Sequence, residues 1–124
     1  MATIQPIIVT SDVDRLQAFY QRMFGAVAES RFPEEGPVFF VMLRVGDSEL
    51  GLVNNDADLS APQRFVLSVR VDDVDALLDQ VEAAGGNVLG PPNDMPWGER
   101  VAHIHDPDGN KLNLTQTIGA SAGR

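Results

Sequence analysis

Cysteine is absent from this sequence, and only two of its 124 residues are histidine. The lack of cysteine excludes disulfide bonds, zinc–thiolate sites and thiol nucleophiles. No apolar run is long enough to cross a bilayer, and the N-terminal segment lacks the basic and apolar regions of a signal peptide. The sequence therefore predicts a cytoplasmic protein that makes no contact with membranes.

Basic residues are also scarce, since 9 Lys and Arg stand against 18 Asp and Glu, which gives a net charge of −9. This charge argues against a nucleic-acid surface and against anionic membranes. It serves solubility and is compatible with a cationic ligand. Apolar residues make up 44% of the chain, so a single domain with one substantial core is expected.

Two segments about half the chain apart share the motif D-V-D followed by a helical apolar pattern. They are residues 11–25 and 72–86. Asp12 and Asp73 suit the N-cap of a helix, where a side-chain oxygen accepts from a free backbone N–H. Gly25 and Gly85 stand where a helix C-cap needs a positive φ. The sequence thus contains an internal repeat built around two helices.

Each expected helix follows one expected strand and precedes three more, separated by Gly- and Pro-containing turns. The strands are expected at 3–10, 27–32, 38–45 and 49–54, and again at 64–71, 87–90, 99–105 and 111–116. The D-P-D-G-N segment at 106–110 suits a turn between antiparallel strands.

These elements predict an α+β fold and a single domain over residues 1–124. Two βαβββ modules would form a curved mixed sheet with a concave cleft and with the helices on the outer face. The parts are module one at 3–54, a linker at 55–63, module two at 64–116 and a tail at 117–124.

Alternation of apolar residues assigns one face of each strand to the helices and the other to the cleft. In strand 111–116, for example, Leu112 and Leu114 are expected against the helix and Asn113 in the cleft. The same argument places these residues on the cleft face: Glu49, Gly51, Val53, Val66, Ser68, Arg70, Lys111 and Thr115.

The layout and the closing motif P-W-G…D-P-D-G-N…L resemble the glyoxalase/bleomycin-resistance/extradiol-dioxygenase superfamily, also called vicinal oxygen chelate. The resemblance covers residues 3–116. That superfamily contains metal lyases, dioxygenases, epoxide-opening thiol transferases and metal-free drug-binding proteins, so the fold does not select one activity. The resemblance also implies a homodimer.

The resemblance implies four metal-ligand positions, which fall on Gln5, Gly51, Val66 and Asn113. Valine and glycine side chains cannot bind a metal, and Gln and Asn offer only neutral oxygens. A dedicated divalent site needs imidazole or carboxylate groups. We therefore expect no metal and no cofactor.

The sequence is compatible with more than one role for the two histidines and for the tryptophan. His103 and His105 share one face of a strand because the side-chain period is two. They could form half of a metal site, supply a general base, or simply end a strand beside a turn. Trp97 lies in a loop, where its ring could stack on a planar ligand or cover the core or a partner subunit.

The partner of the expected cleft carboxylate and the aromatic residue that faces the cleft are also not determined by the sequence pattern. Glu49 is the only carboxylate that the pattern places there, and Arg70 or Lys111 could pair with it or bind an anionic group. Of Phe39 and Phe40, one faces the helix and the other the cleft.

The first functional hypothesis is a metal-free protein that sequesters a small, partly aromatic molecule, and the resemblance to the bleomycin-resistance branch implies that this molecule is an antibiotic and that the role is antibiotic resistance. Its ligand-binding residues are expected to be Gln5, Ile7, Val9, Glu49, Val53, Val66, Ser68, Trp97, His103 and Asn113. The alternative is a glyoxalase- or dioxygenase-like lyase or oxidoreductase, with an atypical metal site or a histidine acid/base.

Overall fold

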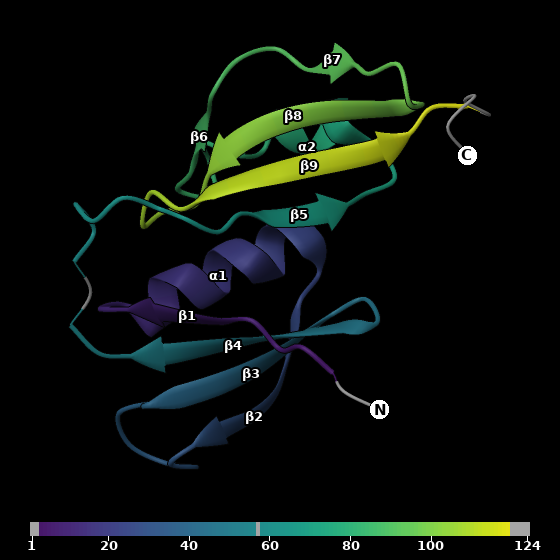
Figure 1. The fold of residues 1–124 in the computed structure, drawn as a ribbon. Coiled ribbons are helices and arrows are strands. Elements are labelled where there is room, and N and C mark those ends of the chain that lie inside the picture. The colour runs from purple at the N-terminus through teal and green to yellow at the C-terminus, as the bar shows by residue number, and fades with distance from the viewer. Residues whose placement is uncertain (1–2, 57, 120–124) are drawn as a thin grey trace. The chain divides into compact units, whose positions relative to one another are not determined.

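The contacts within the chain divide it into two compact units, Met1–Ser60 and Ala61–Arg124. The computed structural model describes residues 3–56 and 58–119. Each unit holds one helix and its own mixed β-sheet (Figure 1). The predicted α+β class is therefore confirmed, and the β-α-β-β-β order is found in the first unit and, with one additional strand, in the second. Within the described residues, neither helix has the length and hydropathy needed to span a membrane.

The first unit contains β1 (Ile7–Thr10), α1 (Val13–Phe24), β2 (Val27–Phe32), β3 (Phe40–Val45) and β4 (Ser48–Asn54). Its strands lie in the order β1-β4-β3-β2. β1 runs parallel to β4, whereas the other two pairs are antiparallel. The strand pairing therefore combines one crossover through α1 with two hairpin-type connections.

Helix α1 begins and ends as the sequence predicts. The Asp12 carboxylate accepts from the backbone N–H of Arg15, and Gly25 adopts the left-handed conformation with φ of 66°. Its buried side chains are Val13, Leu16, Phe19, Tyr20 and Met23. They pack over β3 and β4, and each large apolar side chain buried in this way contributes about 1.5–3 kcal/mol.

The second unit contains β5 (Leu67–Arg70), α2 (Val74–Leu78), β6 (Asn87–Val88), β7 (Asn93–Asp94), β8 (Glu99–His105) and β9 (Lys111–Thr117). The order is β5-β9-β8-β6, and β7 pairs with β8. β5 is parallel to β9, which repeats the pairing of β1 with β4. Helix α2 contacts β8 and β9 and lies behind them in Figure 1.

The second helix is shorter than predicted. It ends at Leu78 with Asp79 as its C-cap, so Gly85 does not cap it, although the φ of Gly85 is 99°. Beyond Leu77 the backbone hydrogen bonds span three residues instead of four: Gln80 N–H donates to the Leu77 carbonyl at 2.9 Å. This i→i+3 spacing is typical of the last turns of helices.

The strand predictions also need correction: β3 begins at Phe40 rather than at residue 38, β4 begins at Ser48 rather than at residue 49, and β6 ends at Val88 rather than at residue 90. β1 begins at Ile7 rather than at residue 3, because Pro6 has no N–H to donate to a ladder. β5 spans only 67–70, and before it the Gln63 side chain donates to the Lys111 carbonyl at 2.9 Å and accepts from the Lys111 N–H. β7 lies in a segment that was expected to be irregular.

The C-terminal strand extends beyond the predicted start of the tail. β9 continues through Thr117, and Ile118 N–H donates to the Gly98 carbonyl at 3.0 Å. Residues 120–124 of the predicted tail lie outside the described residues.

The D-P-D-G-N turn joins β8 to β9 as predicted. The buried Asp106 carboxylate accepts from the backbone N–H groups of Asp108 and Asn110 and from the Asn110 side chain, each at 2.9 Å. Gly109 supplies the positive φ, at 85°. This rigid turn fixes the β8–β9 register, in which His105 lies opposite Lys111 and His103 opposite Asn113.

Candidate functional site

Each sheet has one face turned toward its helix and one turned away, and the second is called the open face below. In β4 the helix-facing Leu50 and Leu52 are buried, and in β9 Leu112 and Leu114 are buried. The residues between them therefore lie on the open face.

The open face of the first unit carries an apolar row that crosses all four strands. Val9 lies opposite Val53, Val53 opposite Phe40, and Phe40 opposite Phe32. Ile7 begins the next row and lies opposite Gly51. The sequence-predicted Ile7, Val9 and Val53 are thus brought together, and Phe40 rather than Phe39 is the aromatic residue on this face.

Gly51 is covered by its neighbours. A Cβ atom at this position would lie 3.1 Å from the ring of Phe40 and 3.2 Å from Cγ1 of Ile7. These separations are shorter than ordinary van der Waals contact, so no side chain fits at residue 51 unless Phe40 and Ile7 move. The position where the resemblance implies a metal ligand is therefore filled by apolar groups.

A row of polar side chains lies at one end of the same face. The Gln5 amide donates to Glu49 at 3.1 Å, and the Arg44 guanidinium donates to Glu49 at 3.2 Å and to Glu29 at 2.7 Å. The hydrogen bond from Arg44 holds the pKa of Glu29 below its ordinary value, and the Glu29 carboxylate raises the pKa of Arg44. The charge of Glu49 is therefore matched within the first unit.

Sequence reasoning missed Arg44, and it considered Arg70 and Lys111 as partners for Glu49. A signal was available, because the two-residue turn Gly46–Asp47 pairs Val45 with Ser48. Counting one residue outward on each strand places Arg44 opposite Glu49.

The open face of the second unit carries a polar row on its three longest strands. Ser68 of β5 lies opposite Asn113 of β9, which lies opposite His103 of β8. The Nδ1 atom of His103 lies 2.7 Å from the Asn113 side-chain oxygen. The sequence placed Ser68 and Asn113 on one face, and the structure brings His103 to the same row.

Trp97 is fixed at one end of this face. Its indole N–H donates to the Glu99 carboxylate at 2.9 Å, and Glu99 also lies 3.6 Å from the Arg70 guanidinium. Half of the Trp97 surface is exposed, at 50%. Arg70 thus pairs with Glu99 and not with Glu49. The last sequence-predicted residue, Val66, precedes β5 and is also exposed.

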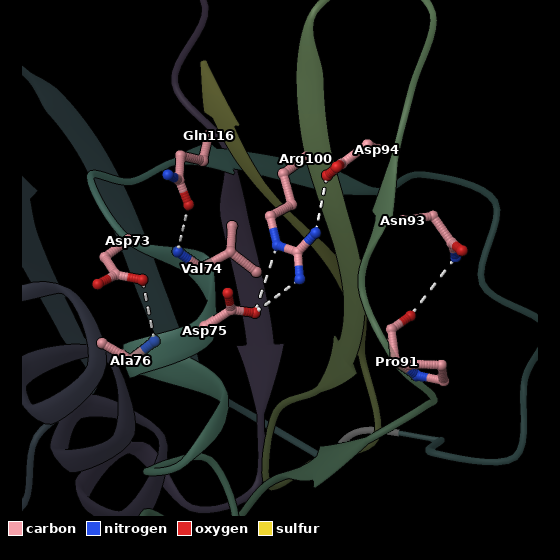
Figure 2. Close-up of polar contacts among 9 residues, drawn as sticks. All are labelled: Asp73, Val74, Asp75, Ala76, Pro91, Asn93, Asp94, Arg100 and Gln116. Carbon is pink, nitrogen blue, oxygen red and sulfur yellow. Dashed lines mark hydrogen bonds and ion pairs between the residues drawn. The ribbon is translucent and has the colours of Figure 1, made fainter. Parts of the chain in front are cut away.

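Arg100 of β8 connects β7 to helix α2, as Figure 2 shows, and the loop that carries Trp97 lies between β7 and β8. The guanidinium lies 3.2 Å from the Asp75 carboxylate of α2 and 2.7 Å from that of Asp94 in β7. These two carboxylates raise the pKa of Arg100. Next to them, Gln116 accepts from the first helical N–H of α2, at Val74. The ion pairs of Arg100 therefore stabilise the elements on both sides of the loop that carries Trp97.

The four implied ligand positions do not fit a divalent metal. Gln5 is bonded to Glu49, Asn113 contacts His103, Gly51 has no side chain, and Val66 is apolar. Within residues 3–56 and 58–119, no group of three His, Cys, Asp or Glu residues is arranged to hold an ion. A divalent metal requires stronger donors than this set provides.

A separate hollow of about 380 Å³ lies between α1 and β2 in the first unit. None of the sequence-predicted site residues lines it, and two of its charged groups already have partners. Glu29 is bonded to Arg44, and Arg31 donates to the Gly36 carbonyl at 2.6 Å. The open faces are therefore the better candidates for ligand binding.

Comparison with known proteins identifies the family of the fold. A family model described as "Glyoxalase/Bleomycin resistance protein/Dioxygenase superfamily" matches residues 3–114. The chain is 32% identical over 102 residues to the "Putative glyoxylase CFP32" of Mycobacterium bovis, a match that covers 82% of this chain. It spans only 39% of that relative's length.

Two further comparisons cover both partners almost completely. The chain is 27% identical to the "Probable lactoylglutathione lyase" of Vibrio parahaemolyticus, over 97% of this chain and 94% of the relative. The crystal structure of a bleomycin resistance determinant encoded on the transposon Tn5 superposes with a TM-score of 0.68 and 25% identity. That match covers 94% of this chain and 98% of the other.

Proposed function

The chain belongs to the glyoxalase/bleomycin resistance protein/dioxygenase superfamily, and on that premise we propose that it binds a small aromatic molecule without a divalent metal. The observation that carries this proposal is the covered position of Gly51. Phe40 and Ile7 occupy the space of a metal-ligating side chain and present apolar surface instead. Sequestration of an antibiotic is the role that fits best, by analogy with the determinant encoded on Tn5.

The proposed contacts follow the chemistry of each open face. In the first unit Ile7, Val9 and Val53 supply apolar surface, and Gln5 and Glu49 supply polar groups. In the second unit the proposed residues are Val66, Ser68, Trp97, His103 and Asn113. Affinity would come from burial of apolar surface and from stacking, with no bond made or broken. The cytoplasmic location stays a prediction.

Fluorescence of Trp97 tests this function, because it is the only tryptophan. We expect saturable quenching by some members of a panel of cationic, neutral and anionic aromatic antibiotics, including bleomycin. Aromatic stacking contributes about 0.5–1.5 kcal/mol beyond area burial, so calorimetry should show binding to Trp97→Ala weakened by roughly two- to tenfold. If no compound binds below about 100 μM, or if Trp97→Ala binds as well as the wild type, the proposal is wrong.

The panel also tests whether the ligand is cationic. Glu49 already faces Arg44 and Gln5, so Glu49→Gln should change the affinity for cations little. A marked loss for cations alone would show that the charge of Glu49, and not only its hydrogen-bonding oxygen, contributes to binding. A preference for anions would implicate the exposed Arg70 or Lys111 instead.

The relatives named as glyoxylase and lactoylglutathione lyase suggest an enzyme as the alternative. Turnover of lactoylglutathione in the presence of added Zn or Ni would decide the matter. We expect none above the rate of the metal alone, because the donor set is too weak to hold the ion.

We also propose that the protein forms a homodimer. β2 is an edge strand whose residues are all exposed, and Val27 and Phe32 are 62% and 67% exposed. Free sheet edges with apolar side chains are surfaces that a two-fold partner covers. Sedimentation should give about twice the chain mass of 13.4 kDa. A monomer at micromolar concentration would contradict the dimer.

A further inference from the structure

We infer that His103, held by Asn113, forms a hydrogen-bond acceptor site for a hydroxyl group of an extended aromatic ligand. The site lies on the open face of the second unit. The inference rests on the proposed function, because it assumes that a small molecule binds this face. It adds the chemical class of the ligand and the residue that selects it.

The contact between the two side chains determines which ring nitrogen carries hydrogen. The Asn113 oxygen can only accept, so at 2.7 Å the Nδ1 atom of His103 must donate to it. In the neutral ring this leaves Nε2 with its lone pair. The register between β8 and β9 makes this arrangement a fixed part of the sheet, because His103 and Asn113 are directly opposite.

The surroundings of His103 favour discrimination between ligands. Val101 and Thr115, which are opposite each other on the same face, are both only 8% exposed. On the other side Leu89, whose N–H donates to the His103 carbonyl at 3.0 Å, is 44% exposed. A ligand that covers this part of the open face removes water from Nε2. A ligand without a donor would then leave an acceptor unpaired, which weakens its binding.

The distance to Trp97 defines the shape of the ligand. Trp97 is bonded to Glu99, which precedes His103 by four residues on β8. Four strand residues span about 13 Å. A molecule that stacks on Trp97 and also reaches Nε2 must therefore be extended, with its aromatic ring and its hydroxyl group near opposite ends.

His105 provides a matched control. It lies on the same strand and face, two residues farther on, but it is opposite Lys111 and Asn87 instead of Asn113. Replacement of either histidine by alanine removes an imidazole from the same open face. Only His103→Ala removes the one oriented by an amide.

The first part of the test measures the tautomer and needs no ligand. Nitrogen-15 NMR of the full chain at a pH where the rings are neutral should show His103 with hydrogen on Nδ1. Asn113→Ala should reduce the population of that form and leave His105 unchanged. Hydrogen on Nε2 of His103 in the wild type would overturn the inference.

The second part uses two extended three-ring probes that differ in one donor, 4-(4′-hydroxybiphenyl-4-yl)pyridine and its methyl ether, with binding measured by calorimetry. The wild type and His105→Ala should bind the hydroxyl probe roughly two- to tenfold more tightly, as expected for one hydrogen bond. His103→Ala should lose this preference, and Asn113→Ala should reduce it.

The outcomes separate this inference from the proposed function. Equal affinities for the two probes in the wild type, or no binding of either, would overturn the inference. If antibiotics still quench Trp97 in that case, the proposed function stands. A preference for hydroxyl that depends on His103, without any Trp97 quenching, would support the acceptor site and reject stacking.

Discussion

The two units of this protein repeat one topology but present different chemistry on their open faces. The first unit is apolar along its middle, and its one polar end is closed by the Gln5–Glu49–Arg44 contacts. The second unit offers a row of Ser68, Asn113 and His103. At matched positions of the last strands, Gly51 is covered by Phe40, whereas Asn113 orients an imidazole. The repeated backbone thus fixes where side chains stand, and a few substitutions decide what each face can bind.

The helices of the two units also differ. Helix α1 buries five side chains, including Phe19 and Tyr20, whereas α2 buries only Val74. In the second unit the large buried residues come mainly from the sheet, at Ile104, Leu112 and Leu114. The core of the first unit therefore depends more on its helix.

The largest expected effect would come from removing a side chain of α1. Phe19→Ala should lower the free energy of unfolding by about 3–5 kcal/mol, because Phe19 is fully buried. Val74→Ala in α2 should cost less, because it removes only two buried methyl groups, at about 0.8 kcal/mol each plus the cost of the smaller cavity they leave. Urea denaturation measures both. Phe65→Ala is the control, since Phe65 is 82% exposed. Equal losses for Phe19→Ala and Val74→Ala would contradict the contrast between the helices.

Substitutions at Gly51 and Asn113, the matched positions of the last strands, should lower the stability by intermediate and different amounts. Gly51→Ala places a methyl group against Phe40 and Ile7 and should destabilise the protein by about 1–3 kcal/mol through overpacking. In a Phe40→Leu background the same change should cost less. Asn113→Ala loses one hydrogen bond, which contributes about 1 kcal/mol. A neutral or stabilising Gly51→Ala would show that the space over residue 51 is not filled.

Much of the fold could be predicted from the sequence because local signals agree with the tertiary structure. The strands at 27–32 and 99–105 have the predicted bounds, and Asp12 and Asp73 are the N-caps. The length of α2 could not be predicted, because its apolar spacing continues to Val81 while the backbone tightens after Leu77. β7 was missed because its pairing with β8 depends on tertiary contact and not on an apolar pattern.

The candidate site was only partly predictable. Alternation placed Ser68, Val53 and Asn113 on the right faces, since side chains alternate strictly along a strand. The polar partners of Glu49 and Asn113 were missed. The pairs Arg44–Glu49 and His103–Asn113 follow from counting outward from the turns at Gly46–Asp47 and 106–110, once the turn geometry is known. The contacts of Trp97 and Arg100 depend on loop conformation, which the sequence pattern does not determine.

The smallest effect concerns the polar end of the first unit. The pKa of Glu29 is lowered by Arg44 in the folded protein, so its stabilising contribution is present above the unfolded pKa and is lost as the pH falls through the folded pKa. Melting temperatures between about pH 7 and about pH 3 should show Arg44→Gln slightly below the wild type at neutral pH and converging with it in acid.

Arg64→Gln serves as the control for this profile, because it removes the same charge from an exposed position outside the Glu29–Arg44–Glu49 contacts. Its difference from the wild type should not follow the titration of Glu29. A constant difference between Arg44→Gln and the wild type across the whole range would contradict the assignment to Glu29.

The metal content of the protein tests the central claim most directly. The full chain should be expressed without a polyhistidine tag in medium that contains Zn, Fe, Mn, Ni and Co. The metal content of the purified protein is then measured by inductively coupled plasma mass spectrometry. Gly51 and Val66 offer no side-chain ligand and Gln5 and Asn113 offer only neutral oxygens, so we expect far less than one ion per chain, with the same background in Gln5→Ala and His103→Ala. One equivalent of a single metal in the wild type, lost in either variant, would contradict a metal-free binding protein.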